Sequence, residues 1–135
     1  MNVYIAADFA RADDAEAVAQ LIERLDSVRV VSRWHKRPSG AEAAVAARIG
    51  GPSDVGVART AARRNLADID ACDVFVVLTT GTTARGGRHF ETGYALARDK
   101  AVVTLGPIEH AFQRLADHNI GDRADLPTVL GGRAE

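Results

Sequence analysis

A chain of 135 residues, 47% of them hydrophobic, has the length and the apolar content of one domain with a single core. Its 17 basic and 18 acidic residues give a formal net charge of -1 without a basic block, which favours a small ligand over a nucleic-acid polymer as partner. No apolar run approaches the roughly 18 residues of a membrane span, and the N-terminus lacks the pattern of a signal peptide, so we expect a cytoplasmic protein that does not bind membranes.

Short apolar runs alternate along the chain with segments whose apolar residues recur at helical spacing, which indicates strands alternating with helices. Strands are expected, in chain order, at residues 3–7, 28–31, 73–78, 101–105 and, as a last edge strand, 126–130. Helices are expected at residues 15–25, 53–71, 86–98 and 107–117, with Ser53 as the candidate cap of the second. Residues 34–49 are expected to form a loop with a helical piece.

This alternation predicts an α/β fold with a single domain over residues 1–135. The expected form is a doubly wound, flavodoxin-like sheet of five parallel strands in the order 2-1-3-4-5, with helices on both faces. Ligands of such sheets bind at the carboxyl ends of the strands, here beside the switch point between strands one and three. That crevice receives Ala7, Asp8 and Phe9 from the first loop and residues 79–89 from the loop after the third strand.

Several common chemistries have no motif in this chain. The first strand–helix loop, AADFARAD, contains no glycine, which argues against a dinucleotide fingerprint, and no Walker sequence or G-x-S-x-G elbow is present. The four histidines are scattered and the one cysteine, Cys72, stands alone, so no metal-ligand spacing emerges. We expect neither a metal ion nor an organic cofactor.

The stretch GGRHFETGYALARDK, residues 86–100, carries the strongest local signal. The glycines Gly86 and Gly87 allow close approach of a ligand to the backbone, and Arg88 and His89 at the start of a helix suit phosphate or a sugar hydroxyl. Glu91, expected in the first turn, would be favoured in its ionised form by the helix dipole and would suit attack on a sugar carbon. The spacing alone equally fits a glutamate that only stabilises a helix start.

Two aromatic residues have a structural and a functional interpretation. Tyr4 on the first strand fits a core aromatic more readily than a site hydroxyl. Trp34, the one tryptophan, could stack on a base or pack at the end of a strand. Trp34, and Phe9 in the first loop, are candidate substrate contacts near the crevice.

Taken in order, three segments of the chain resemble the nucleoside 2-deoxyribosyltransferase family, including its relatives that hydrolyse nucleoside 5′-monophosphates. VYIAADF is similar to the family's first strand, RRNLADIDACDVFVVL to its R-D-L-x-x-I-x-x-A-D segment, and GGRHFETGYALARDKAVVTLG to its G-x-x-x-E-x-G-Y-A-x-A-x-x-K-P-V-V pattern. The resemblance implies that Glu91 is the nucleophile and that the hydroxyl of Tyr4 binds it. It also implies a nucleoside or nucleotide substrate, no cofactor and a homo-oligomer, most simply a dimer.

The chain departs from the family pattern at Asn65, where the R-D-L motif has an aspartate that assists proton transfer. An asparagine holds a hydroxyl but gives no acidic proton, so Asp8 becomes the candidate acid. Transfer to a base and hydrolysis stay open, with Arg88 and His89 tilting the interpretation toward a nucleotide hydrolase. The alternative function is a catalytically weakened nucleotide-binding module with the same crevice.

Overall fold

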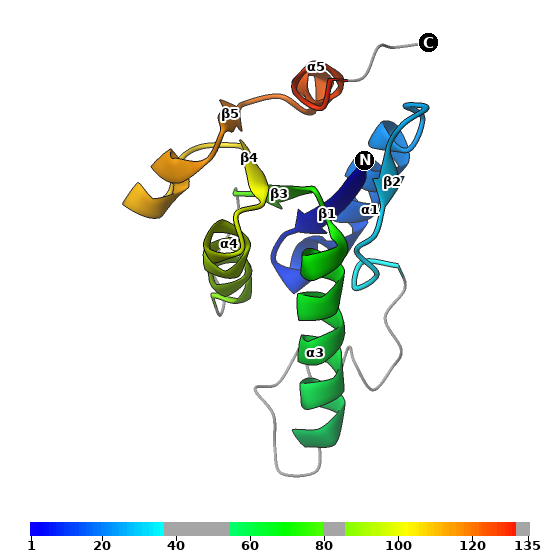
Figure 1. Cartoon of the computed structure of the whole chain (residues 1–135), viewed down its shortest axis with the longest axis vertical. Helices are drawn as coiled ribbons and strands as arrows, with labels where there is room; N and C mark the ends of the chain where they lie inside the picture. The colour runs from blue at the N-terminus through cyan, green and yellow to red at the C-terminus, as the bar shows by residue number, and fades with distance from the viewer. Residues whose placement is uncertain (37–54, 80–85, 132–135) are drawn as a thin grey trace.

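The computed structural model describes residues 1–36, 55–79 and 86–131. In this part of the chain, five parallel strands form one sheet in the order β2-β1-β3-β4-β5 (Figure 1). The strands are β1 (Asn2–Ala6), β2 (Arg29–Val30), β3 (Val74–Leu78), β4 (Ala101–Leu105) and β5 (His118–Ile120). The predicted fold class and strand order are confirmed.

Helices cover both faces of this sheet, as the alternating pattern predicts. The described helices are α1 (Ala12–Ile22), α3 (Val55–Ala71), α4 (Gly87–Ala97) and α5 (Leu126–Val129), with 3-10 turns η1 (Phe9–Arg11), η3 (Ala111–Leu115) and η4 (Arg123–Asp125). Among them no helix has both the length and the apolar character to cross a membrane.

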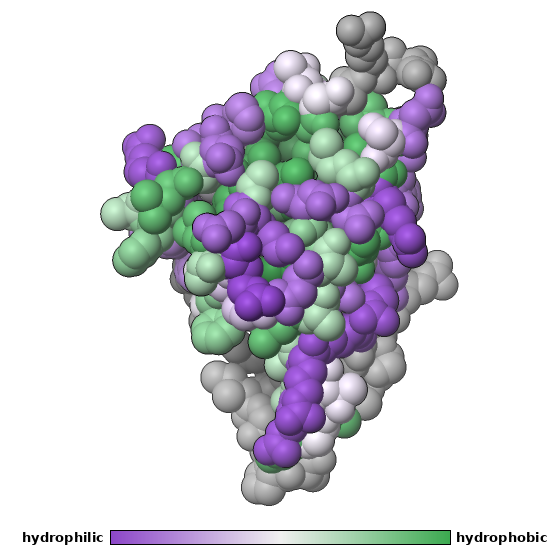
Figure 2. Space-filling view, viewed as in Figure 1, coloured by the Kyte–Doolittle hydropathy of each residue, from purple (hydrophilic) through white to green (hydrophobic). Residues whose placement is uncertain are grey.

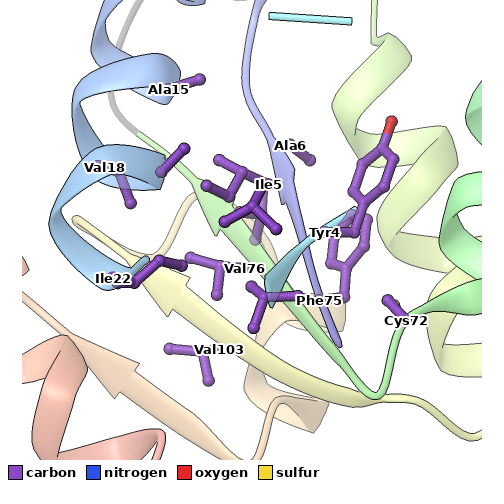
Figure 3. Close-up of a cluster of buried hydrophobic side chains, with 14 of the residues drawn as sticks. Tyr4, Ile5, Ala6, Ala15, Val18, Ile22, Cys72, Phe75, Val76 and Val103 are labelled. Carbon is purple, nitrogen blue, oxygen red and sulfur yellow. The ribbon is translucent and has the colours of Figure 1, made fainter. Parts of the chain in front are cut away.

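The central strands are apolar at successive positions because both of their faces are buried. Side chains alternate between these faces, so residues opposite each other on β1 and β3 share one. One face packs against α1, and Figure 3 shows the small and branched side chains that fill it, Ile5, Ala15, Val18, Ile22, Val76 and Val103. On the other face the rings of Tyr4 and Phe75 stack at 5.4 Å, on the side where α3 and α4 lie.

Two expected elements near the C-terminus are wrong. The segment 126–130, expected to be an edge strand, is the helix α5, whose first turn contains Pro127, a residue preorganised for helix starts. The fifth strand is instead His118–Ile120, a short and mostly exposed edge strand whose polar residues give no alternating pattern. The helix expected at 107–117 is reduced to the 3-10 turn η3.

Other expected boundaries shift by a few residues or lie outside the described residues. The helix expected from Ser53 is described from Val55, and Ser53 itself falls outside the described part. Of the loop expected at residues 34–49, the structure describes only Trp34–Lys36, which form a turn. Of the expected crevice loop 79–89, the structure describes Thr79 and residues 86–89.

Candidate functional site

Tyr4 joins the core of the sheet to helix α4. Its ring is fully buried against Phe75, and its hydroxyl donates a hydrogen bond of 2.9 Å to Oε2 of Glu91. Burial, together with the Glu91 charge, raises the pKa of Tyr4 well above its ordinary value, so the hydroxyl keeps its proton and remains a donor. Tyr4 is therefore a core aromatic residue whose hydroxyl contacts Glu91.

Glu91 lies in the second turn of α4 rather than in the first. The helix begins at Gly87, and the residue before it, Gly86, has a φ of 78°, a left-handed conformation that favours glycine. The first turn contains no acidic residue, so the expected stabilisation of an ionised Glu91 by the helix dipole is wrong. Burial instead raises the pKa of Glu91 to about 7, against the opposing effect of hydrogen bonds from Tyr4 and Asn65.

Asn65 comes from helix α3 and reaches the same carboxylate. Its hydrogen bond to Glu91 lowers the pKa of that carboxyl, so the side-chain amide acts as the donor. Its Oδ1 is buried and has no hydrogen-bond partner within the part of the chain that the structure describes. Tyr4, Asn65 and Glu91, which are far apart in sequence, thus converge on one half-buried carboxylate.

Arg88 lies one turn before Glu91, and its guanidinium is enclosed by acidic partners. Its Nε donates to Oδ1 of Asp8 at 2.9 Å, while Nη1 and Nη2 donate to the two carboxylate oxygens of Glu109, the latter at 2.8 Å. Only 1% of the Arg88 side chain is exposed. The arginine that the sequence assigned to a ligand therefore binds two carboxylates of its own chain.

His89 turns toward the segment after β4. Its ring meets that of His110 edge to face at 4.6 Å, with Nδ1 of His89 and Nε2 of His110 3.0 Å apart. Burial lowers the pKa of His89, and the charges of Arg88 and His110 act in the same direction, so this ring is less inclined to carry a positive charge.

Phe9 and Trp34 lie next to each other, with ring centroids 6.3 Å apart. Trp34 is only 6% exposed, and its Nε1 donates to the carbonyl of Ile5, so most of its ring packs in the core. Phe9 is 38% exposed and presents the more accessible aromatic surface of the two.

Sequence reasoning missed Glu109, Gln113 and His110, which the structure brings to the residues discussed above. The motif ends at residue 106, and the segment that follows is expected only as a helix, without a motif that would mark its polar residues. The signal available was the arginine itself, because an arginine that becomes buried needs acidic partners from elsewhere in the chain. Within the described ranges, no group of three or more potential metal ligands gathers.

Comparisons with known proteins agree with this fold. The model of a protein family described as nucleoside 2-deoxyribosyltransferase matches residues 3–124, whereas no curated protein matches the chain. A 2-deoxyribosyltransferase from the psychrotolerant bacterium Bacillus psychrosaccharolyticus superposes with a TM-score of 0.67 at 17% identity, over 93% of this chain and 90% of that one. The CMP N-glycosidase BcmB of Clostridium botulinum superposes with a TM-score of 0.54 at 15% identity, over 97% and 99% of the two chains.

Proposed function

The chain belongs to the nucleoside 2-deoxyribosyltransferase family, and from this premise we propose that it cleaves or transfers at the N-glycosidic bond of a nucleoside or nucleoside 5′-monophosphate with Glu91 as nucleophile. The observation that carries the proposal is the hydrogen bond of 2.9 Å from Tyr4 to the half-buried carboxylate of Glu91. The two solved structures support the same class of reaction, since one is a 2-deoxyribosyltransferase and the other a CMP N-glycosidase.

In the proposed first step, an ionised oxygen of Glu91 attacks the anomeric carbon of the sugar. The bond between that carbon and the base nitrogen breaks, and the base leaves with the electron pair and takes up a proton. Tyr4 holds Oε2 of Glu91 and thereby orients the carboxylate, and Asn65 holds it from the side of α3. A covalent glycosyl-enzyme results.

In the second step an acceptor attacks the same carbon from the opposite side, and the bond to Glu91 breaks. Water as acceptor gives hydrolysis, and a second base gives transfer, so the two reactions share their first half. Because each step inverts the anomeric carbon, the product retains the original configuration.

Asn65 bears on how fast the first step runs. An asparagine amide donates a hydrogen bond but not an acidic proton. Asp8, the candidate acid, already accepts a hydrogen bond from Arg88. This arrangement favours Asp8 as a binding group and leaves the proton of the departing base to solvent. The absence of an acid at position 65 also favours a second candidate function, a weakened enzyme that mainly binds its nucleotide.

The test is release of free base from a panel of nucleosides and 5′-monophosphates, followed by chromatography with and without an added acceptor base. Glu91→Gln preserves the shape of the side chain and should abolish release, whereas Glu23→Gln, the same change at an exposed position, should leave it unchanged. A new nucleoside formed only with the acceptor base indicates transfer. Tight binding of a nucleotide without any release would favour the binding module, and wild-type turnover in Glu91→Gln would refute the proposed nucleophile.

A further inference from the structure

The buried arginine beside the candidate site belongs to a closed group of polar side chains, Asp8, Arg88, Glu109 and Gln113, which we name the Arg88 cluster. Its ion pairs join the end of β1, helix α4 and the segment that follows β4. Gln113 completes the group, because its Nε2 donates to Oε1 of Glu109 at 3.2 Å and its Oε1 accepts from the backbone N–H of Glu109 at 2.7 Å. The cluster is thus held in one arrangement by several hydrogen bonds.

The charges of this cluster do not balance. One guanidinium faces two carboxylates, so the cluster carries a net charge of -1 when its acids are ionised. Arg88 uses Nε, Nη1 and Nη2 on these two partners and is almost wholly buried. It therefore has no exposed surface to offer a phosphate, and the excess charge would repel one.

One carboxylate oxygen of the cluster has no hydrogen-bond partner among the described residues. Oδ1 of Asp8 is bound by Arg88, whereas Oδ2 is buried without a hydrogen bond in the described part of the chain. The Asp8 side chain as a whole is 10% exposed. A buried acceptor without a donor is costly, so a group that brings a donor to it is stabilised.

The position of Asp8 places its side chain beside the same helix that carries the candidate nucleophile. Asp8 follows the end of β1 with an extended backbone, and its side chain, like that of Tyr4, contacts helix α4. Tyr4 contacts Glu91, and Asp8 contacts Arg88, which is one helical turn away from Glu91. Both contacts therefore connect β1 and the loop that follows it to neighbouring turns of α4.

We propose that Asp8 is a specificity-determining residue, whose free Oδ2 accepts a hydrogen bond from one hydroxyl of the sugar and whose cluster rejects a phosphate at that position. The inference rests on the proposed function for the identity of the ligand, a nucleoside. Arg88 acts as a positioning residue that fixes Asp8 through Oδ1 and leaves Oδ2 for the ligand. The preferred substrate is then a nucleoside with that hydroxyl free, which reverses the tilt toward a nucleotide that the motif alone suggested.

The test measures binding by calorimetry, with Glu91→Gln protein so that no ligand is consumed. The ligands are a 2′-deoxynucleoside, its 3′-deoxy and 5′-deoxy analogues, and its 3′- and 5′-monophosphates. We expect loss of one of the two hydroxyls to weaken binding about tenfold, and a phosphate at that same position to weaken it by at least about as much. Equal affinity for both deoxy analogues and the parent, or a monophosphate at each position that binds as tightly as the nucleoside, would overturn the inference.

The protein variant adds a second, independent arm. Asp8→Asn in the same background keeps the shape and removes the charge, and we expect it to reduce the phosphate penalty by about tenfold. An unchanged penalty in a folded variant would count against Asp8, and the deoxy analogues still decide the matter should the variant not fold. The proposed function is tested separately by base release. Glu91-dependent release with a preference for monophosphates supports that function and rejects this inference. Nucleoside binding with the expected preferences but without release supports this inference and rejects the proposed function.

Discussion

The carboxylate of Glu91 has to be ionised to attack a sugar carbon, yet its surroundings favour the protonated form. Burial is the larger effect on its pKa, and the hydrogen bonds from Tyr4 and Asn65 offset it only in part. The result, a pKa of about 7, places the titration of the proposed nucleophile near neutral pH.

The first prediction concerns the pH dependence of base release. Because only ionised Glu91 is a nucleophile, kcat/KM should fall about tenfold per pH unit below a midpoint near 7 and level off above it. Tyr4→Phe removes a hydrogen bond that lowers the pKa of Glu91, so the midpoint should move to higher pH. A pH–rate profile of both proteins measures the shift, and a midpoint near 4.5 in the wild type would contradict the assigned environment.

The second prediction concerns stability. A carboxyl whose pKa is 4.5 in the unfolded chain and about 7 in the folded one binds more protons when folded, so the free energy of unfolding decreases as pH rises from 4.5 to 7. The loss is on the order of 3 kcal/mol. Glu91→Gln removes this pH-dependent loss of stability. The introduced amide can also donate to Oδ1 of Asn65, which has no hydrogen-bond partner in the described part of the chain.

Denaturant titrations at pH 5 and pH 8 test this prediction. Glu91→Gln should gain more over the wild type at pH 8 than at pH 5, whereas Glu23→Gln at an exposed position should show no such trend. The same difference at both pH values would mean that Glu91 titrates normally in the folded protein.

The third prediction concerns Asn65→Asp. The change replaces a hydrogen-bond donor to Glu91 by a second acid, and two adjacent carboxyls share a proton over part of the pH range. The singly protonated pair combines a nucleophile with a proton donor, so we expect a bell-shaped pH–rate profile whose maximum exceeds the wild-type rate by as much as about 10²-fold. A profile that stays monotonic with an unchanged rate would show that position 65 does not face the departing base.

At the scale of the elements, side chains replace the strand pairing where β2 ends. The backbone N–H of Ile5 donates to Ser32 Oγ at 3.1 Å, and the carbonyl of Ile5 accepts from Nε1 of Trp34 at 2.6 Å. Ser32 in turn is hydrogen-bonded to His35, whose Nδ1 lies 2.9 Å from the carboxylate of Glu16. This turn holds the backbone of Ile5, the residue after Tyr4, and so helps to position Tyr4 in the candidate site.

The fourth prediction tests that support. Trp34→Phe keeps an aromatic ring but leaves the carbonyl of Ile5 without its donor in a buried place, which should lower the free energy of unfolding by about 1–3 kcal/mol. Urea denaturation measures the loss. Phe90→Leu, a change at an exposed aromatic residue, serves as the control, and an equally small effect of both variants would contradict the assigned role.

Periodicity was enough to place the strands of the sheet and its main helices, because their buried faces repeat with the period of the element. It failed for β5 and α5, where three mostly exposed residues form the strand and four residues form the helix. Periodicity also gives no information on what the individual residues of the motif do. Tyr94 of α4, for example, donates to the carboxylate of Asp70 of α3, and Lys100, which follows α4, donates to the backbone carbonyl of Asp70.

At the scale of the whole molecule, the candidate site depends on contacts that no local pattern contains. The family resemblance predicted the pairing of Tyr4 with Glu91, which spans 87 positions. It did not predict that Arg88 forms ion pairs with Asp8 and Glu109. Glu109 lies in a segment without a motif, and the sequence offers Asp8 as a candidate acid rather than as a partner of Arg88. The partners of a buried charge follow from the fold, and only the need for partners follows from the sequence.

The surface of the molecule bears on the expected homo-oligomer. Two large apolar side chains of η3 are exposed, Phe112 by 69% and Leu115 by 65%. Figure 2 shows apolar surface at the left edge of the molecule, where Figure 1 has η3. Exposed apolar side chains that lie close together are typical of contact surfaces between chains.

The fifth prediction is that the protein forms a homo-oligomer, most simply a two-fold dimer, and that η3 contributes to the contact. Light scattering at micromolar concentration should give twice the mass of the 14.3 kDa chain for a dimer. Phe112→Asp combined with Leu115→Asp should shift the mass to that of the monomer, because a carboxylate in an apolar contact loses its hydration. Both side chains are exposed in the single chain, so circular dichroism should show an intact fold in the variant. A wild-type monomer would refute the expected oligomer, and an oligomer that survives both substitutions would place its contact on another surface.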